Sequence, residues 1–404
     1  MKFAAAAAAC ALAAACLATP AGAQVSDDVV KIGILNDMNG PFADIVGESD
    51  VVAARLAIED FGGTVLGKKI ELVVADHQNK ADIGSAIARR WFDEEKVDVI
   101  AGLGASSVAL AVRALTRDRG KIDLATSTGT PDMTGAACSR TGFQWNYDTY
   151  ALAKVMGTAT RKQGDTWFLL AADYAFGHAL ATDLAKFVTA AGGKVLGVAR
   201  HPLNSQDFSS YLLQAKSSGA QIVGLANFAY DALNSIKQAS EFGLVAGGQK
   251  VVGLLIFVTD VRAIGLAQVQ GLLATESFYW DLNDDTRSFA KRFNERRKGF
   301  MPNSNNASMY SAVTHYLKGI QASGTDDGRK VADAMRALPI KDITLASGSV
   351  REDGRIMRPM YLFGTKPVAQ SKGEWDVYDV VSTVAPEDAW RPLAEGGCAY
   401  VAKN

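Results

Sequence analysis

The alternation of short β-branched runs with longer amphipathic patterns constrains the fold of this chain more than any other feature. The segments between the runs repeat apolar residues at i, i+3 and i+4, as amphipathic helices do, and several end at glycine. Repeated strand–helix units predict parallel sheets covered by helices on both faces. The expected strands are residues 29–35, 69–75, 97–103, 122–126, 166–171, 194–199, 221–226 and 250–257.

The strand–helix unit runs twice, once before Phe143 and once after Tyr150. The 404-residue chain is also longer than one ordinary domain. We therefore expect an α/β fold with two doubly wound parallel-sheet lobes. After Gly271 the order changes, with a strand-like run at 272–280 followed by helical patterns at 286–297, 307–320 and 330–338. Extended runs at 345–350 and 358–363 then flank Asp353-Gly354, a dipeptide typical of hairpin turns.

The first residues are typical of a cleavable export signal. Lys2 precedes an apolar run of Ala, Leu and Cys, and Thr19-Pro20-Ala21-Gly22-Ala23 ends in the small-x-small pattern of a cleavage site. We expect cleavage after Ala23 and a periplasmic mature protein. Lipidation of Cys16 is the alternative, although Leu12 lies one place too far upstream for the usual motif. No later apolar run reaches the roughly 18–20 residues of a membrane span.

Charge and cysteine content narrow the possible partners. Loss of Lys2 with the signal changes the formal charge from −1 to −2, which is too near neutral to indicate nucleic acid, a polyanion or an anionic membrane. Cys10 and Cys16 leave with the signal, so Cys138 and Cys398 remain in a compartment that permits disulfides. We expect them to form a disulfide. Two buried thiols are the alternative.

Glycine-rich and polar segments follow the expected strands in a characteristic order. They are Met38-Asn39-Gly40-Pro41, Gly62-Gly63 with Gly67, Gly104-Ala105-Ser106-Ser107, Thr130-Pro131-Asp132-Met133-Thr134, Asp173-Tyr174-Ala175-Phe176-Gly177 and Asp207-Phe208-Ser209. Over essentially the whole mature chain, this order resembles the type I periplasmic solute-binding proteins of ABC transporters, the branched-chain amino-acid-binding group.

The resemblance implies two lobes joined by three crossovers, a ligand in the cleft between them, and closure that presents a surface to a membrane permease. We expect residues 24–146 and 279–344 to form the first lobe and residues 147–278 and 345–404 the second. The expected partners are a small ligand and an inner-membrane ABC permease, with the protein a monomer that holds no cofactor or metal.

Ligands of open parallel sheets bind beyond the carboxyl ends of the strands, so the loops there are the candidate site. Ser106 and Ser107 follow the third strand where a helix starts, a place suited to a carboxylate. Ser107 is the better ligand candidate and Ser106 the better helix cap. Ser127-Thr128-Gly129 resembles the family's carboxylate-binding segment. Gly129 stands where amino-acid binders usually carry Thr.

On the facing lobe, aromatic side chains are the main candidates. Tyr150 and Tyr174 have flat apolar faces with a polar tip, although a core role is open for each. Asn227 and Phe228 follow a strand, and Asp231 is either a residue of the cleft rim or a solvated helix cap.

The residues that would meet a ligand ammonium group depart from the family pattern. Asp148 is a candidate for the first of two acids that amino-acid-binding members use. Around the second, Leu254-Leu255-Ile256-Phe257-Val258 contains no acid before Asp260. A buried cation without its counter-charge costs several kcal/mol, so a carboxylate on an aromatic body fits better than an α-amino acid. Phe257 and Trp280, together with Tyr150 and Phe228, are the candidates to contact the aromatic ring of such a ligand.

Catalytic signatures are missing from the sequence. The four histidines, His77, His178, His201 and His315, occur in separate units without a paired metal-binding motif. Gly102-Leu103-Gly104 begins like a dinucleotide fingerprint, but Ser107 replaces its third glycine. We therefore expect a binding protein and no enzyme. An amino-acid-binding transporter subunit and a ligand sensor for a receptor kinase remain alternative functions.

Overall fold

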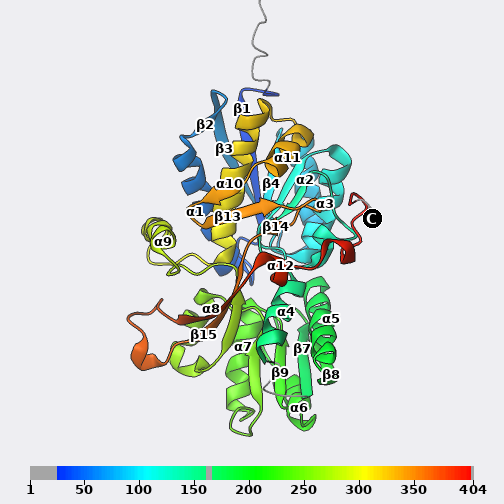
Figure 1. Ribbon diagram of the computed structural model, residues 1–404, viewed down its shortest axis with the longest axis vertical. Helices are drawn as coiled ribbons and strands as arrows, with labels where there is room; N and C mark the ends of the chain where they lie inside the picture. Colours follow the sequence, from blue (N-terminus) through cyan, green and yellow to red (C-terminus); the bar gives the residue numbers. More distant parts are fainter. Residues whose placement is uncertain (1–24, 161–165, 402–404) are drawn as a thin grey trace, which may run out of the picture.

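The computed structural model describes residues 25–160 and 166–401. The predicted signal, its cleavage after Ala23 and the alternative lipidation at Cys16 lie outside these residues. The described chain forms two α/β bodies stacked along the long axis of the molecule (Figure 1).

The first lobe is built on a six-stranded sheet in the order β2-β3-β1-β4-β5-β6. All its pairs are parallel except β2 with β3. Along β1, Val30, Ile32 and Ile34 belong to one core cluster and Leu35 to another, so the sheet is buried on both faces. The strands are β1 (Val29–Asn36), β2 (Thr64–Val65), β3 (Lys68–Asp76), β4 (Val99–Gly102), β5 (Ile122–Ala125) and β6 (Gly142–Gln144).

Helices cover both faces of this first sheet. On one face lie α1 (Ala43–Phe61), α10 (Ser304–Ser323) and α11 (Gly328–Ala337), and on the other α2 (Ala81–Asp93) and α3 (Ser106–Arg119). Helix α9 (Asp284–Arg296) begins after Asn283, whose side chain accepts a hydrogen bond from Thr286 N. Helix α1 ends at Gly62, which takes the left-handed conformation (φ 94°) that favours glycine.

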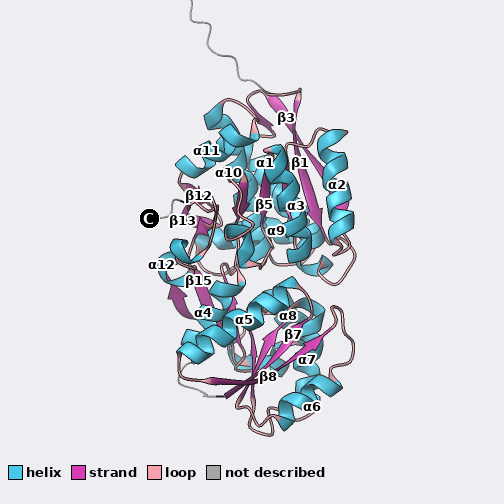
Figure 2. Ribbon diagram, turned by 90° about the vertical axis from the view of Figure 1, so that its right-hand side faces the viewer, coloured by secondary structure: helices cyan, strands magenta, loops and turns pink. Residues whose placement is uncertain are grey.

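The second lobe is built on a four-stranded parallel sheet in the order β10-β9-β7-β8. Figure 2 shows its strands between α5 on one side and α6 and α7 on the other. The elements are α4 (Thr149–Thr160), β7 (Thr166–Ala172), α5 (Ala175–Ala190), β8 (Lys194–His201), α6 (Ser209–Ser217), β9 (Ile222–Ala226), α7 (Ala229–Glu241), β10 (Lys250–Gly253) and α8 (Val258–Ile264).

Two antiparallel sheets complete the lobes, one with each lobe. The first contains β12 (Ile340–Asp342), β13 (Leu345–Val350) and β14 (Ile356–Met357), and the second contains β11 (Leu273–Glu276), β15 (Met360–Thr365) and β16 (Tyr378–Val384). The remaining short helices are η1 (Pro131–Thr134), η2 (Leu266–Val269), η3 (Val368–Gln370), α12 (Pro386–Ala389) and η4 (Leu393–Glu395).

The predicted hairpin around Asp353-Gly354 is correct in its first strand and its turn but wrong in its second strand. Strand β13 pairs with β14, whereas the expected partner at 358–363 becomes β15, which pairs with β11 and β16. Buried Arg358 separates the two sheets, donating to Ser308 Oγ at 3.1 Å and to the Ser277 carbonyl at 3.0 Å. At this residue the chain passes from the sheet of β13 and β14 to the sheet of β15.

The predicted lobe boundaries stay a prediction, and two structural features bear on them. Leu345 and Ile356 belong to the core cluster of the first sheet, which favours a return to the second lobe near residue 358. The C-terminal segment then runs back beside α3 of the first lobe (Figure 1). There Cys398 forms the expected disulfide with Cys138, 260 residues away, so that prediction is confirmed.

Candidate ligand-binding cleft

Aromatic side chains from loops of the two lobes meet at the carboxyl ends of the parallel strands. Phe42, after β1, stacks on Phe228, after β9, with ring centroids 4.5 Å apart. Phe176, after β7, contacts Phe228 edge-on at 5.1 Å. Tyr147, after β6, lies 6.1 Å from Phe257, after β10. These contacts join the lobes through one aromatic cleft lining and correspond to a closed arrangement.

The local backbone holds the two stacked rings in place. The Asp37 carboxylate accepts hydrogen bonds from Gly40 N at 2.7 Å and Phe42 N at 3.0 Å, which fixes the loop between β1 and α1. Phe228 is extended at the start of α7, and Ala229 follows it with φ 56°. A positive φ is uncommon for a residue other than glycine, so this turn stores strain at the cleft.

Ser106 and Ser107 lie at the start of α3, as predicted, but the predicted cap is wrong. The N-cap position belongs to Ala105, and α3 begins at Ser106 without a side-chain cap. Ser106 is buried and Ser107 is half-buried. The first N–H groups of a helix have no partner within it, so this end of α3 suits an anionic ligand group.

The segment Ser127-Thr128-Gly129 lies beside this helix start, and its two hydroxyls already have partners. Ser127 Oγ lies 3.4 Å from Asp50 Oδ2, and Thr128 Oγ1 donates to the Leu103 carbonyl. A Cβ atom built on Gly129 would lie 2.5 Å from the Phe176 ring. The closed cleft therefore has no room for a threonine at position 129, which explains the departure seen in the sequence.

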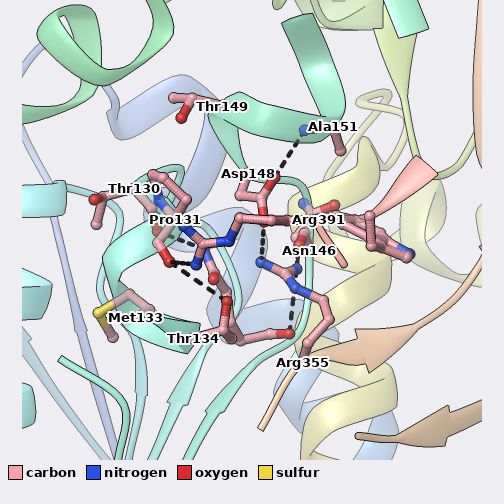
Figure 3. A network of polar contacts seen from close by, with 12 residues as sticks. Thr130, Pro131, Met133, Thr134, Asn146, Asp148, Thr149, Ala151, Arg355 and Arg391 are labelled. Carbon is pink, nitrogen blue, oxygen red and sulfur yellow. Dashed lines mark hydrogen bonds and ion pairs between the residues drawn. The ribbon is translucent and has the colours of Figure 1, made fainter. Parts of the chain in front are cut away.

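Asp148 is committed to a buried ion pair. Its Oδ2 accepts from Arg355 Nη2 at 2.8 Å, and its Oδ1 accepts from Ala151 N at 2.8 Å, at the start of α4 (Figure 3). Arg355 also donates to the Asn146 carbonyl. Burial lowers the pKa of Arg355 to about 10, and Asp148 opposes that shift. The Asp148 carboxylate thus joins the start of α4 to Arg355 and is not free for a ligand ammonium group.

Tyr150 lies outside the aromatic cleft lining. It packs edge-on against Phe187 of α5 at 5.0 Å, with the Lys154 and Lys186 ammonium groups 5.8 and 5.6 Å from its ring centre. Tyr147, and not the predicted Tyr150, belongs to the aromatic cleft lining; it is 2% exposed, and its Oη lies 3.4 Å from the Ser127 carbonyl. The position of Tyr147 directly after β6 was a signal that sequence reasoning missed.

Two polar groups in the loops after β7 and β9 have no partner among the described residues. They are the buried Tyr174 Oη and the buried Asn227 Oδ1. Asn227 is oriented by Nδ2, which lies 3.1 Å from His201 Nε2 and 3.3 Å from Ser235 Oγ. Because β7 and β9 are neighbours, the loops that carry Tyr174 and Asn227 adjoin.

Asp231 is neither at the rim nor solvated. It is 3% exposed, and its carboxylate accepts from Asn204 N at 3.1 Å and Ser205 N at 2.8 Å. It therefore fixes the loop after β8. Trp280 also lies elsewhere, since its Nε1 donates at 2.9 Å to the carbonyl of Trp375 and its ring packs against Tyr279.

Phe257 lies at the N-cap of α8, four residues after β10 ends at Gly253, so the expected strand is too long. The next acid, Asp260, accepts from Phe257 N at 2.9 Å and is buried. Burial raises the pKa of Asp260 to about 7, which disfavours its charged form. This acid therefore caps its own helix.

The cleft loops contain no lysine or arginine at residues 37–42, 103–107, 126–130, 146–149, 173–176, 227–230 and 254–258. An anionic ligand would thus rely on N–H and hydroxyl donors. Across residues 25–160 and 166–401, no group of three or more His, Cys, Asp or Glu side chains is arranged to hold a metal ion. None of the helices in that part of the chain has the length and apolar character of a membrane span.

The comparisons with known proteins agree on one family. A model described as periplasmic binding protein matches residues 29–373. A leucine-, isoleucine-, valine-, threonine- and alanine-binding protein from Pseudomonas aeruginosa is 26% identical over 325 residues, which are 77% of this chain and 83% of that protein.

Solved structures show the same fold. A periplasmic binding protein from Burkholderia mallei is 45% identical, with a TM-score of 0.90 over 92% of this chain and 99% of that chain. A branched-chain amino-acid ABC transporter periplasmic ligand-binding protein from Burkholderia xenovorans LB400 is 41% identical, with a TM-score of 0.81 over the same shares. An R. palustris solute-binding protein in complex with benzoate is 22% identical, with a TM-score of 0.81 over 92% of this chain and 99% of that one.

Proposed function

Because the chain belongs to the periplasmic binding protein family, we propose that it captures a small aromatic carboxylate in the periplasm and delivers it to an ABC permease. Cleft closure around the ligand would be the signal that the permease reads. A ligand that contacts both lobes binds the closed form more tightly than the open form. The difference between the two binding free energies is the free energy by which the ligand favours closure.

The carboxylate end of the ligand is assigned to the first lobe. The start of α3, with Ser106 and Ser107, supplies N–H and hydroxyl donors, and the backbone at Gly129 lies beside it. Removing an ionised carboxylate from water is favourable only when such donors replace its hydration. The aromatic body would lie beside Phe42, Tyr147, Phe228 and Phe257, whose rings contact one another in pairs between the lobes.

The main support for the proposal is that three acids near the cleft already have partners within the protein. Asp148 pairs with Arg355, and Asp260 accepts from the N–H of Phe257. Asp231 is bound to the loop after β8. A ligand ammonium group beside these three acids would find no free counter-charge among them, which costs several kcal/mol. The benzoate found in the R. palustris protein supports an aromatic acid as a ligand for this fold.

Binding of a matched ligand pair tests the proposal. Phenylalanine and 3-phenylpropionate differ only in the ammonium group, so calorimetric titration of both into the mature protein isolates that group. We expect 3-phenylpropionate or benzoate to bind, and to raise the free energy of unfolding by about 2.7 kcal/mol at 100 times the dissociation constant. Micromolar binding of leucine or phenylalanine without binding of the acids would instead support an amino-acid-binding subunit.

Delivery to a permease is tested separately. The liganded protein should stimulate the ATPase activity of its reconstituted ABC permease, and the ligand-free protein should not. Activation of a receptor kinase without ATPase stimulation would favour the sensor function.

A further inference from the structure

An arginine-lined cavity of about 450 Å³ opens on the first lobe, away from the cleft. Gly120 precedes β5 and Thr141 precedes β6, so the cavity lies at the amino ends of the strands, whereas the cleft lies at their carboxyl ends. We call it the arginine cavity. Its polar lining residues are Arg117, Arg140, Arg329, Ser139, Thr141 and Asp333.

Three elements bring the arginines together. Arg117 lies in the last turn of α3, Arg329 is the second residue of α11, and Arg140 lies in the loop before β6. The Arg329 side chain lies over Gly120, where a Cβ atom would be 3.2 Å from its Nε. The tail contributes Tyr400, whose ring centre is 5.4 Å from the Arg140 guanidinium carbon.

Within residues 25–160 and 166–401, these guanidinium groups have few acidic partners. The carboxylate nearest Arg117 is that of Asp118, at 3.8 Å. The buried carboxylate of Asp123 is already paired with Arg113 at 2.7 Å. Asp333 is the one acid among the described residues that line the cavity. Positive charge therefore exceeds negative charge locally, although the whole chain is near neutral.

Arg336 adds to this excess. Its Nη2 lies 3.5 Å from the carbonyl of Ser139, a lining residue, and its guanidinium carbon lies 4.9 Å from the ring centre of Phe143. Burial lowers the pKa of Arg336, Asp333 opposes the shift, and the like charges of Arg140 and Arg113 add to it. Like charges crowded in this way indicate a place where an anion would be stabilised.

We propose that the arginine cavity binds a phosphate-type oxyanion, such as a phosphate ester or pyrophosphate, independently of the cleft ligand. Guanidinium groups match phosphate oxygens with paired N–H donors, and several of them together favour a multiply charged anion over a single carboxylate. The hydroxyls of Ser139 and Thr141 are hydrogen-bonded to each other at 3.2 Å, so one of them keeps a proton to donate at the buried end. The same chemistry occurs in a free phosphate ester and in a phospholipid headgroup.

Calorimetric titration with pyrophosphate and with glycerol 3-phosphate tests the proposal on the mature protein. The test variant is Arg140→Gln/Arg329→Gln. The control variant, Arg55→Gln/Arg89→Gln, removes the same charge from exposed positions outside the cavity. We expect saturable binding that weakens at least tenfold in the test variant and less than twofold in the control. Equal binding by the two variants, or no saturable binding by the unmodified protein, would overturn the proposal.

Two further measurements complete the test. Sedimentation with phosphatidylglycerol and phosphatidylcholine vesicles separates the sources, because a headgroup site retains the protein on the anionic vesicles alone and a site for free phosphate esters does not. If the double variant fails to fold, as judged by its thermal midpoint without anion, Arg329→Lys keeps the charge and removes the paired donors. Unchanged affinity in Arg329→Lys would then contradict the proposed role of Arg329.

Discussion

The first lobe offers the cleft the start of a helix, the backbone of Ser127-Thr128-Gly129 and the ring of Phe42, whereas the second lobe offers the rings of Phe176, Phe228 and Phe257. This difference separates two tasks. Hydrogen-bond donors on one wall suit the charged end of a ligand. Apolar surface on the other wall is buried when the cleft closes, which favours the closed form. The second wall also carries two unpartnered polar atoms, Tyr174 Oη and Asn227 Oδ1, which suit a polar substituent far from the carboxylate.

Phe228→Ala should have the largest effect, because Phe228 contacts Phe42 of the first lobe and Phe176 of its own lobe. We expect binding of an aromatic acid to weaken by about 3 kcal/mol, as for a central aromatic residue of an interface. Calorimetric titration measures the change. Tyr150→Leu is the matched control and should leave the affinity unchanged, since Tyr150 packs on Phe187. The reverse ranking would restore Tyr150 to the site.

Gly129→Thr tests whether the two walls must touch. The new Cβ would meet the Phe176 ring at 2.5 Å, so closure would require one wall to move. We expect ligand affinity to fall by about 2 kcal/mol, within the usual range for overpacking. Adding Phe176→Ala should recover part of this loss, and a double-mutant cycle gives the coupling. Purely additive effects would argue against the contact.

Ser107→Ala tests the donor wall. Loss of a hydrogen bond to a charged group should weaken carboxylate binding by about 1–2 kcal/mol. The matched measurement uses the amide of the same acid, whose affinity should change less because it carries no charge. An unchanged affinity for the acid would remove Ser107 from the site.

Asp260→Asn should have the smallest effect. We expect it to change how the free energy of unfolding depends on pH. Burial raises the pKa of Asp260 from 3.8 to about 7, with Asp44 adding to the shift. Between these values the folded protein holds a proton that the unfolded chain releases, so stability falls as pH rises through this window. Asparagine keeps an acceptor for Phe257 N without the charge.

We therefore expect the Asp260→Asn variant and the unmodified protein to be similar at pH 4, and the variant to be about 1 kcal/mol more stable at pH 8. Urea unfolding at both pH values measures this difference. The exposed Asp285→Asn variant is the control. A variant that loses stability equally at both pH values would show that the carboxylate is needed as a charged cap.

Much of the fold was predictable because its signals are local. Apolar spacing predicted both parallel sheets, and the ligand site in the loops after their strands stays a prediction. The disulfide followed from the two cysteines that remain after export. Ser106 and Ser107 were placed correctly at a helix start. The cap was not, because the helix begins one residue earlier than expected and Ala105 takes the N-cap position.

Long-range pairing decided the rest. No local pattern couples Asp148 to Arg355, which lies 207 residues later in the chain. The choice between Tyr147 and Tyr150 depends on α4 beginning at Thr149, which turns Tyr150 towards α5 and leaves Tyr147 in the cleft. The sequence by itself determined the alternating elements, the loops and the cysteine pair, because these depend on neighbouring residues. Only the tertiary structure decided which acids are already paired and which rings meet, because those contacts form when distant segments pack together.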